Sequence, residues 1–338
     1  MNSKERFIAA LNGETVDRVP VFPLLMRFAA KKSGFTYRQF TENGILLAQA
    51  QLRMLAEFDL DAISSCSDAF RISTDLGGEV IFDDELPPRI KRPIIASMQD
   101  LKGLSRPDVT RNGSRCADRI RGVDEMVRAV GNTHYVLGWV DFPFAEACSC
   151  CGVQNFMLMM LDNPKLAHAV LSFITDIVID FALAQLAKGA PMVGCGDAAA
   201  SLVSNEMFRE FALPYERQVV DSIHKYGGLA KTHICGNTTQ LIDSLAQNGS
   251  DLYNIDHMVD LKNAKDVYSR YDKAIKGNVD PVLILRDSPE EIYTAAKNCV
   301  ELTKGSKYIL SPGCEIPPDT PDENLLAFCQ AAKPSLTT

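Results

Sequence analysis

The chain has 338 residues, 46% of them hydrophobic and 23% charged, which is close to a globular average and excludes extended disorder. Its formal net charge of −8 excludes the basic surface that nucleic acids and anionic membranes select. The first residues begin an amphipathic helix, and no uncharged apolar run approaches the length of a membrane span. We therefore expect a cytoplasmic protein that acts on small molecules, with no nucleic-acid or membrane partner.

Short apolar runs of strand length alternate with helical patterns along the chain, which predicts a parallel sheet wrapped by helices. The eight runs are Arg18–Leu25, Asp61–Cys66, Tyr135–Val140, Met192–Gly196, Leu229–Cys235, Leu252–Asp256, Ala274–Val279 and Tyr308–Ser311. Eight such units in one chain of this length predict an α/β fold, a TIM (β/α)8 barrel, as a single domain over residues 1–338.

Two additions to the barrel are expected. A first helix, Lys4–Leu11, closes on Asn12-Gly13 and forms an N-terminal helical extension. The second and third strands are separated by about 70 residues, too many for a simple connection. Within this insertion, residues 79–82 and 89–94 predict a β-hairpin, and a helix follows over about 115–130.

Three further helices carry start signals. Asn163-Pro164 opens a long helix that ends at Lys188-Gly189, with proline at the first position and glycine after the last. Ser288-Pro289-Glu290-Glu291 and Thr320-Pro321-Asp322-Glu323 each place Glu three residues after a hydroxyl residue, which predicts a capping box at both sites.

The active site of such a barrel lies at the carboxyl ends of its strands, so the residues there are the candidates for chemistry. His233 and Cys235 end the fifth strand, and Cys314 follows the eighth. Because residues i and i+2 of a strand point to the same side, the imidazole and the thiol should converge. A core histidine with a buried cysteine is the alternative. We favour a Zn²⁺ site with one open position, because 78 residues between the two cysteines argue against a zinc finger.

Carboxylates occupy other strand ends. Asp197, Asp256 and Asp280 are expected either to orient His233, to supply a fourth oxygen ligand, or only to cap the helices that follow. Asp68 borders the insertion, where it would contact a substrate cation or a loop arginine. We take Asp68, Asp197 and Asp256 as candidate catalytic residues, and Asn278 with Asp280 as candidate cofactor-binding residues.

The ten cysteines are irregularly spread through a chain too long to need disulfides, so we expect them to be reduced. Cys148, Cys150 and Cys151 follow the third strand. They would complete the zinc shell or respond to oxidation, but packing in a loop-to-helix turn is favoured. The remaining expectations are burial for Cys66, Cys195, Cys299 and Cys329, exposure for Cys116, and a surface or capping position for His134, His168 and His224.

Four segments resemble the uroporphyrinogen decarboxylase superfamily and extend over nearly the whole chain. They are Asp17-Arg18-Val19-Pro20-Val21, Leu213-Pro214-Tyr215, Gly277-Asn278-Val279-Asp280-Pro281 and Gly313-Cys314-Glu315-Ile316-Pro317-Pro318-Asp319-Thr320-Pro321. The resemblance implies a TIM barrel, in a superfamily that contains both tetrapyrrole decarboxylases and corrinoid-dependent methyltransferases.

Departures from the decarboxylase pattern favour the methyltransferases. The arginine-rich run that holds the carboxylates of the tetrapyrrole is replaced by residues 25–30, where only Arg27 survives. Cys314 stands where decarboxylases have histidine, and His233-x-Cys235 with Cys314 resembles the zinc motif of methylcobamide:coenzyme M methyltransferases.

The resemblance thus implies a zinc-dependent methyltransferase that moves a methyl group between a corrinoid and a thiol such as coenzyme M. No Asp-x-His-x-x-Gly corrinoid-binding motif occurs in the sequence, so the corrinoid (cobalamin) is expected on a partner protein. The direction of transfer is open, and the site would equally demethylate a methoxy, methylamine or methylthio donor. A uroporphyrinogen decarboxylase, a non-catalytic corrinoid- or tetrapyrrole-binding protein, and a homodimeric assembly also stay open.

Overall fold

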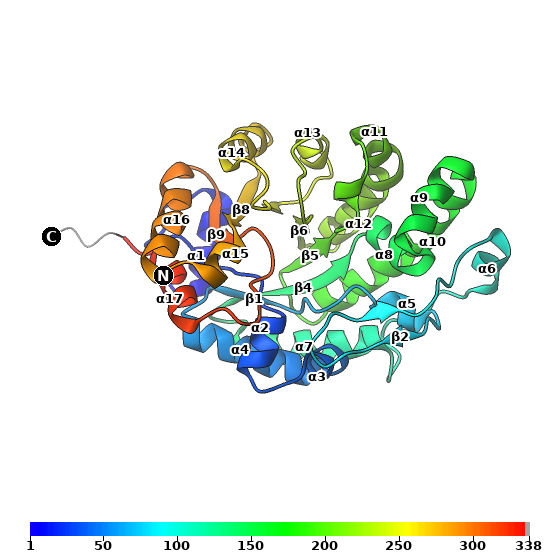
Figure 1. Ribbon diagram of the computed structural model, residues 1–338, viewed down its shortest axis with the longest axis horizontal. Coiled ribbons are helices and arrows are strands. Elements are labelled where there is room, and N and C mark those ends of the chain that lie inside the picture. The colour runs from blue at the N-terminus through cyan, green and yellow to red at the C-terminus, as the bar shows by residue number, and fades with distance from the viewer. Residues whose placement is uncertain (335–338) are drawn as a thin grey trace.

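The computed structural model describes residues 1–334. Its main sheet has seven parallel strands in the order β1, β4, β5, β6, β7, β8, β9, which is also their order along the chain. These strands are β1 Ala62–Ser64, β4 Tyr135–Asp141, β5 Met192–Gly196, β6 Leu229–His233, β7 Leu252–Asn254, β8 Ala274–Val279 and β9 Tyr308–Pro312. The sheet curls, and its helices lie around the outside, which confirms the predicted α/β barrel (Figure 1).

The larger helices cover the outer face of the sheet (Figure 1). Besides α1 Ser3–Asn12, which lies at the amino end of the barrel, they are α4 Gly44–Phe58, α7 Arg115–Val130, α8 Pro143–Cys151, α9 Val153–Asp162, α10 Pro164–Leu186, α12 Leu213–Lys225, α14 Leu261–Arg270, α16 Pro289–Leu302 and α17 Asp322–Gln330. The shorter ones are α2 Arg27–Lys32, α3 Tyr37–Glu42, α5 Arg71–Asp75, α6 Met98–Gly103, α11 Asn205–Met207, α13 Ile242–Leu245, α15 Pro281–Arg286, the 3₁₀ turn η1 Ala200–Leu202 and the π-helical η2 Phe208–Ala212.

The predicted first strand, Arg18–Leu25, is present only as two isolated bridges, Val21 to Leu310 and Leu24 to Glu315. Pro20 and Pro23 lack the backbone N–H that a continuous ladder requires, so a regular strand cannot form there. The segment still lies between the two edges of the sheet. Its Val21 carbonyl accepts a hydrogen bond from Asp61 N at 3.0 Å, next to β1, while its Phe22 N donates to β9.

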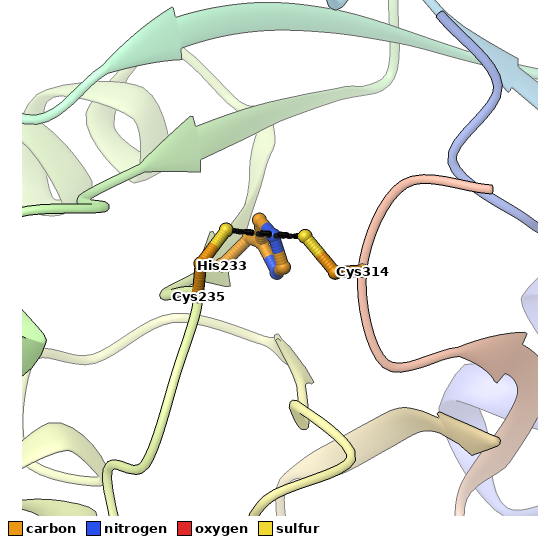
Figure 2. Close-up of side chains that lie close together, drawn as sticks. All are labelled: His233, Cys235 and Cys314. Carbon is orange, nitrogen blue, oxygen red and sulfur yellow. Dashed lines mark hydrogen bonds between the residues drawn. The ribbon is translucent and has the colours of Figure 1, made fainter. Parts of the chain in front are cut away.

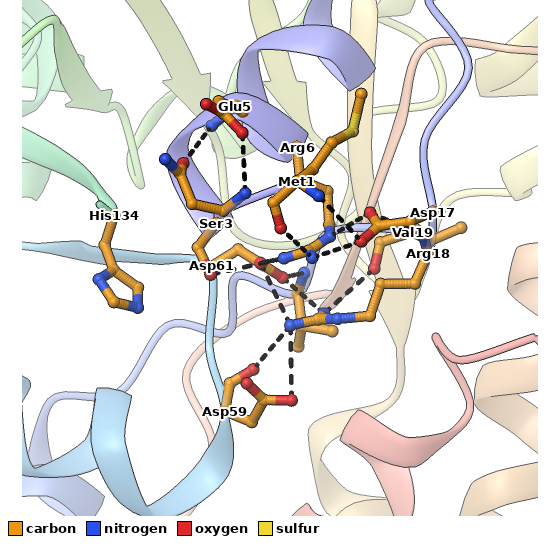
Figure 3. Close-up of polar contacts among 12 residues, drawn as sticks. Met1, Ser3, Glu5, Arg6, Asp17, Arg18, Val19, Asp59, Asp61 and His134 are labelled. Carbon is orange, nitrogen blue, oxygen red and sulfur yellow. Dashed lines mark hydrogen bonds and ion pairs between the residues drawn. The ribbon is translucent and has the colours of Figure 1, made fainter. Parts of the chain in front are cut away.

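Asp61 fastens this closing segment at the amino end of β1 (Figure 3). Its carboxylate is fully buried and pairs with Arg6 Nη1 at 2.6 Å and with Arg18 Nη1 at 2.7 Å. The same carboxylate accepts a hydrogen bond from Val21 N at 2.7 Å. The Asp17-Arg18 pair of the family motif therefore has a structural role, because Arg18 joins the closing segment to the start of the sheet.

The first helix, α1, lies across the amino end of the barrel, in agreement with an extension outside the ring of strands. Its Phe7 is completely buried and stacks on Tyr135 with 4.3 Å between ring centroids, and it also meets Phe22 edge-on. A capping box of Asn2 and Glu5 starts the helix, and Gly13 in a left-handed conformation ends it.

The insertion after the second predicted strand contains the expected hairpin. Strands β2 Val80–Ile81 and β3 Arg89–Ile90 pair in antiparallel fashion, although they are shorter than predicted. The helix that follows, α7, matches the predicted range. Cys116 near its start is fully buried, so the expected exposure of this residue is wrong. It lies on the buried face together with Ile120 and Val123, because α7 packs this face inward.

Two of the three helix-start predictions are confirmed. Asn163 caps α10 with Pro164 at the first position, and Ser288 forms the predicted capping box with Glu291. The box predicted at Thr320 is wrong, because α17 begins one residue later and Pro321 occupies the N-cap position. Helix α10 is apolar enough by composition to cross a membrane, but about half of the relevant window is buried and packs in the protein core.

Candidate metal centre

The three predicted soft ligands meet at the carboxyl end of the barrel (Figure 2). His233 is the last residue of β6, Cys235 is two residues beyond it, and Cys314 lies just after β9. Cys235 Sγ lies 3.2 Å from His233 Nε2 and 3.2 Å from Cys314 Sγ, while Cys314 Sγ lies 3.7 Å from the same nitrogen. Strand alternation, and the curl of the sheet that brings the ends of β6 and β9 together, therefore assemble the set as expected.

The donor set fits a zinc ion. Zn²⁺ binds imidazole nitrogen and thiolate sulfur at about 2.0–2.3 Å in a tetrahedron whose edges are therefore about 3.3–3.8 Å. Of the three separations, 3.7 Å lies within that range and the two of 3.2 Å lie just below it. Among residues 1–334, the group of close potential ligands comprises these three and no fourth side chain. Such a set would leave one coordination position for a small molecule.

The two thiols of the site differ in their acidity. The pKa of Cys235 is raised, first by its contact with Cys314 and then by burial. The pKa of Cys314 is lowered to about 3, because Cys235 and His233 stabilise its thiolate, although burial opposes this. The contact thus favours ionisation of Cys314 before Cys235. A divalent cation between the sulfurs would displace the remaining proton.

Asp256 fixes the loop that presents Cys235. Its Oδ2 accepts a hydrogen bond from Gly236 N at 3.0 Å, and its Oδ1 accepts one from Met258 N at 3.0 Å. Gly236 has φ near +90°, a conformation that glycine adopts readily and that turns the chain directly after the ligand. Asp256 does not line the cavity beside the ligands, so the structure places this candidate catalytic residue behind the loop, in a position to orient Cys235.

A cavity of about 230 Å³ opens beside the three ligands. Its lining includes four carboxyl side chains: Asp68, Asp141, Asp197 and Glu315. Apolar and aromatic contacts come from Leu24, Met26 and Trp139, and from small residues of the loops after β1 and β5. Two of the three candidate catalytic aspartates, Asp68 and Asp197, are therefore on the cavity wall.

Asp68 contacts an arginine of the insertion, which is one of the two partners expected for it. Arg115 Nη1 lies 2.8 Å from Asp68 Oδ1, and Nη2 lies 3.0 Å from Oδ2, so the pair is bidentate. Burial raises the pKa of the Asp68 carboxyl. Arg115, together with Arg71 and Arg119, lowers it by more, so the net pKa is well below the ordinary value. Asp68 is therefore ionised and already neutralised.

Asp197 is buried without such a cation. Its carboxylate oxygens have no ordinary hydrogen-bond partner among the described residues, and the nearest acidic neighbour is Glu216 on α12. Burial, and then Glu216, raise the pKa of Asp197 well above its usual range. Because burial and a neighbouring like charge both disfavour ionisation, the pair of Asp197 and Glu216 retains a proton more readily than exposed carboxyl groups do.

The two candidate cofactor-binding residues lie away from the cavity lining. Asp280 is the N-cap of α15 and accepts a hydrogen bond from Val282 N at 2.8 Å. Asn278 donates to the carbonyl oxygens of Asp256 at 3.1 Å and Val259 at 2.7 Å. Both therefore hold loops of the barrel mouth, and a role in binding a cofactor stays a prediction.

The cysteine cluster after the third predicted strand is helical. Cys148, Cys150 and Cys151 lie in α8 and are buried, which agrees with packing and places none of them in the metal-ligand group. Of the four other cysteines expected to be buried, Cys299 is only partly so.

Sequence reasoning missed the residues that complete the cavity wall. Trp139 and Asp141 belong to β4, and the predicted strand ended one residue before Asp141. Arg71 Nη2 binds Asp141 Oδ2 at 2.6 Å from a completely buried position. The alternation of β4 was an available signal for Trp139 and Asp141, because both share its inward face.

The fold and the three converging side chains define an α/β barrel with a group of potential soft-metal ligands at its carboxyl end. The chain matches the uroporphyrinogen decarboxylase (URO-D) family over residues 2–334 and belongs to that family.

Relatives with two different activities are similar to this chain. A uroporphyrinogen decarboxylase of Coxiella burnetii is 29% identical over 350 aligned positions, covering 97% of this chain and 94% of that protein. The methylcobamide:CoM methyltransferase MtbA of Methanosarcina acetivorans is 27% identical over 346 positions, covering 98% and 97%. The structure of a methyltransferase from Methanosarcina mazei shares the fold, with a TM-score of 0.87, 24% identity and 98% of each chain covered.

Proposed function

We propose that this protein is a cytoplasmic zinc-dependent methyltransferase, which moves a methyl group between a corrinoid on a partner protein and a thiol acceptor. The observation that carries the proposal is the convergence of His233, Cys235 and Cys314 within 3.7 Å beside a cavity. The similarity to MtbA, whose name specifies a methylcobamide and CoM, supports it.

The residues of the site suit activation of a thiol. Zinc held by these three residues would convert a bound thiol into a thiolate, which is the nucleophilic form. Asp256 and Gly236 keep Cys235 in place through the backbone of its loop. The cavity beside the ligands gives the acceptor a defined position, next to the buried side chains of Leu24 and Trp139.

The mouth of the barrel offers apolar side chains to a corrinoid-carrying partner. Leu202, after β5, is 67% exposed, and Met258, after β7, is 55% exposed. Val282, in the first turn after β8, is 41% exposed. These side chains lie in segments that follow the carboxyl ends of the strands, Leu202 in η1 and Val282 in α15, where a docked protein would bring its methyl group over the cavity.

The same residues would serve the reverse reaction, in which a methyl donor binds at the metal and Co(I) corrinoid accepts the methyl group. Decarboxylation of uroporphyrinogen is less well supported. Arg27 is the only arginine in residues 25–30, where decarboxylases have an arginine-rich run, and it pairs with Glu315 at 3.3 Å. Among the described residues, no lysine or arginine lines the cavity. A polycarboxylate therefore lacks its counter-charges.

Metal analysis of three matched cysteine variants tests the site. Cys235→Ala and Cys314→Ala should lose the one zinc per chain expected of the wild type, while Cys299→Ala, in α16 and away from the site, should keep it. Circular dichroism should show that all three remain folded, because catalytic metal sites seldom hold a barrel together. Full zinc in both site variants would refute the ligand assignment.

A methyl-transfer assay tests the reaction. Methylcobalamin is mixed with coenzyme M, homocysteine or tetrahydrofolate, and the change in corrinoid absorbance is followed. Transfer should require zinc and should disappear in Cys314→Ala. Stoichiometric zinc without transfer to or from any corrinoid would favour a non-catalytic binding protein instead.

A further inference from the structure

The wall of the cavity beside the metal ligands carries acidic groups and no free cation. Asp68, Asp141, Asp197 and Glu315 line it, whereas His233 is the one basic residue of the lining among the described residues. As His233 is a proposed metal ligand, its imidazole is not available to bind a substrate anion.

The arginines nearest the wall are already engaged. Arg115 is bidentate with Asp68, and Arg71, completely buried, holds Asp141 at 2.6 Å. Arg27 donates a hydrogen bond from Nη2 to Glu315 Oε2 at 3.3 Å. Each guanidinium thus neutralises a carboxylate of the wall, and a second anion would have to compete with that bond.

Two lysines lie inside the barrel but do not line the cavity. Lys231 is completely buried with its ammonium 4.4 Å from the centre of the Trp139 ring. Lys276 is equally buried and donates a hydrogen bond to the carbonyl of Phe22 at 2.7 Å. Neither can reach a substrate without displacing the barrel interior.

These facts limit the chemistry of the small molecule. In a short anionic thiol the acid group is two carbons from the sulfur, so a metal-bound sulfur would hold that acid group inside this cavity. Burying an anion without a counter-ion or donors is strongly unfavourable. An uncharged carbon body next to the sulfur avoids this cost.

A second compartment extends from the first. It has a volume of about 390 Å³ and shares Ala69, Asp141 and Ala198 with the metal-side cavity. The rest of its lining is mostly apolar, with Phe70, Ile90, Ala145, Val153, Ala199 and Leu202. Arg89, exposed on the hairpin, lines only this outer compartment.

We infer that the thiol served by this site has an uncharged, apolar body next to its sulfur, of aryl or branched alkyl type, and is not a short anionic thiol. The sulfur lies at the metal ligands, and the body passes Asp141 into the apolar compartment. This inference rests on the proposed function, because it assumes that the open metal position receives a thiol.

Calorimetry on the zinc-loaded protein tests the inference with three thiols. Coenzyme M and 2-mercaptoethanol are both two-carbon thiols, but coenzyme M ends in a sulfonate and 2-mercaptoethanol in a hydroxyl. Benzyl mercaptan carries an apolar ring instead. We expect 2-mercaptoethanol to bind about tenfold more tightly than coenzyme M, and benzyl mercaptan on the order of 100-fold more tightly than 2-mercaptoethanol. Coenzyme M binding as tightly as 2-mercaptoethanol, or more tightly, would overturn the inference.

Variants of the apolar compartment locate the ring. Ala145→Phe and Ala199→Phe each fill part of it, so benzyl mercaptan should lose at least about tenfold in affinity while 2-mercaptoethanol binds as before. Ala198→Arg places a cation where the two compartments meet and should raise the affinity for coenzyme M about tenfold. If both phenylalanine variants bind benzyl mercaptan like the wild type, the ring lies elsewhere and the inference fails.

Failure of the proposed function gives a different result. Thiols that bind in the expected order without any methyl transfer would remove the methyltransferase proposal and leave the assigned binding site. Methyl transfer to coenzyme M, with coenzyme M also the tightest ligand, would support the methyltransferase and overturn the inference about the thiol.

Discussion

Replacing Asp61 by Asn tests how the barrel is closed. The substitution keeps the shape of the side chain but removes its charge, and leaves the guanidinium groups of Arg6 and Arg18 without their buried partner. Loss of one member of a buried ion pair costs about 3–5 kcal/mol. At about 2.1 cal/mol/K per residue, the unfolding entropy of 338 residues is about 0.7 kcal/mol/K, so the melting temperature should fall by about 4–7 °C.

Differential scanning calorimetry would measure the shift against a matched control. Asp272→Asn removes a carboxylate that is 86% exposed and pairs with Lys307 at 2.8 Å. An exposed pair contributes at most about 1 kcal/mol, so this control should melt within about 2 °C of the wild type. If the melting temperature of Asp61→Asn also stays within about 2 °C of the wild type, backbone contacts alone hold the segment with Val21, and the ion pairs of Asp61 do not.

Three further outcomes are expected at the site. Asp256→Ala removes the acceptor for Gly236 N and should weaken zinc binding about tenfold in a chelator competition; unchanged affinity would show that the loop holds itself. Burial raises the pKa of Glu216 from 4.5 to about 7, so between these two pH values the folded protein holds a proton that the unfolded chain has lost. The stability of the fold therefore falls as the pH rises from 4.5 to about 7. Glu216→Gln should therefore raise the melting temperature more at pH 8 than at pH 5, whereas an equal shift would contradict a protonated carboxyl pair. Binding of a thiol to the zinc form should release about one proton near pH 7, counted by calorimetry in buffers of different ionisation enthalpy, and no release would remove the activated thiolate.

The convergence of the three candidate ligands was predictable because its signal is local. Alternation along one strand places His233 and Cys235 on the same side, and a parallel sheet collects strand ends at one edge, which brings in Cys314. The first strand was predicted from its apolar run, but the two missing N–H groups of Pro20 and Pro23 reduce it to bridges.

The wall of the cavity was not predictable, because its charge pairs join distant parts of the chain. Arg71 and Asp141 are 70 residues apart, and Asp68 and Arg115 are 47 apart. No periodicity or motif reports which buried arginine faces which carboxylate. The burial of Cys116 was recoverable, since the helical spacing of Ile120 and Val123 places it on the same face.

The charge balance that zinc would give the site supports the inferred uncharged acceptor. Two positive charges on a zinc ion would balance the thiolates of Cys235 and Cys314, so one further thiolate leaves a single negative charge. Lys231, two residues before His233 on the same side of β6, is a buried cation near that charge, and burial lowers its pKa only to about 8, which leaves it mostly protonated at pH 7. One ammonium compensates one thiolate. An acceptor with a sulfonate beside its sulfur would bring a second negative charge, for which the described residues provide no free partner on the cavity wall.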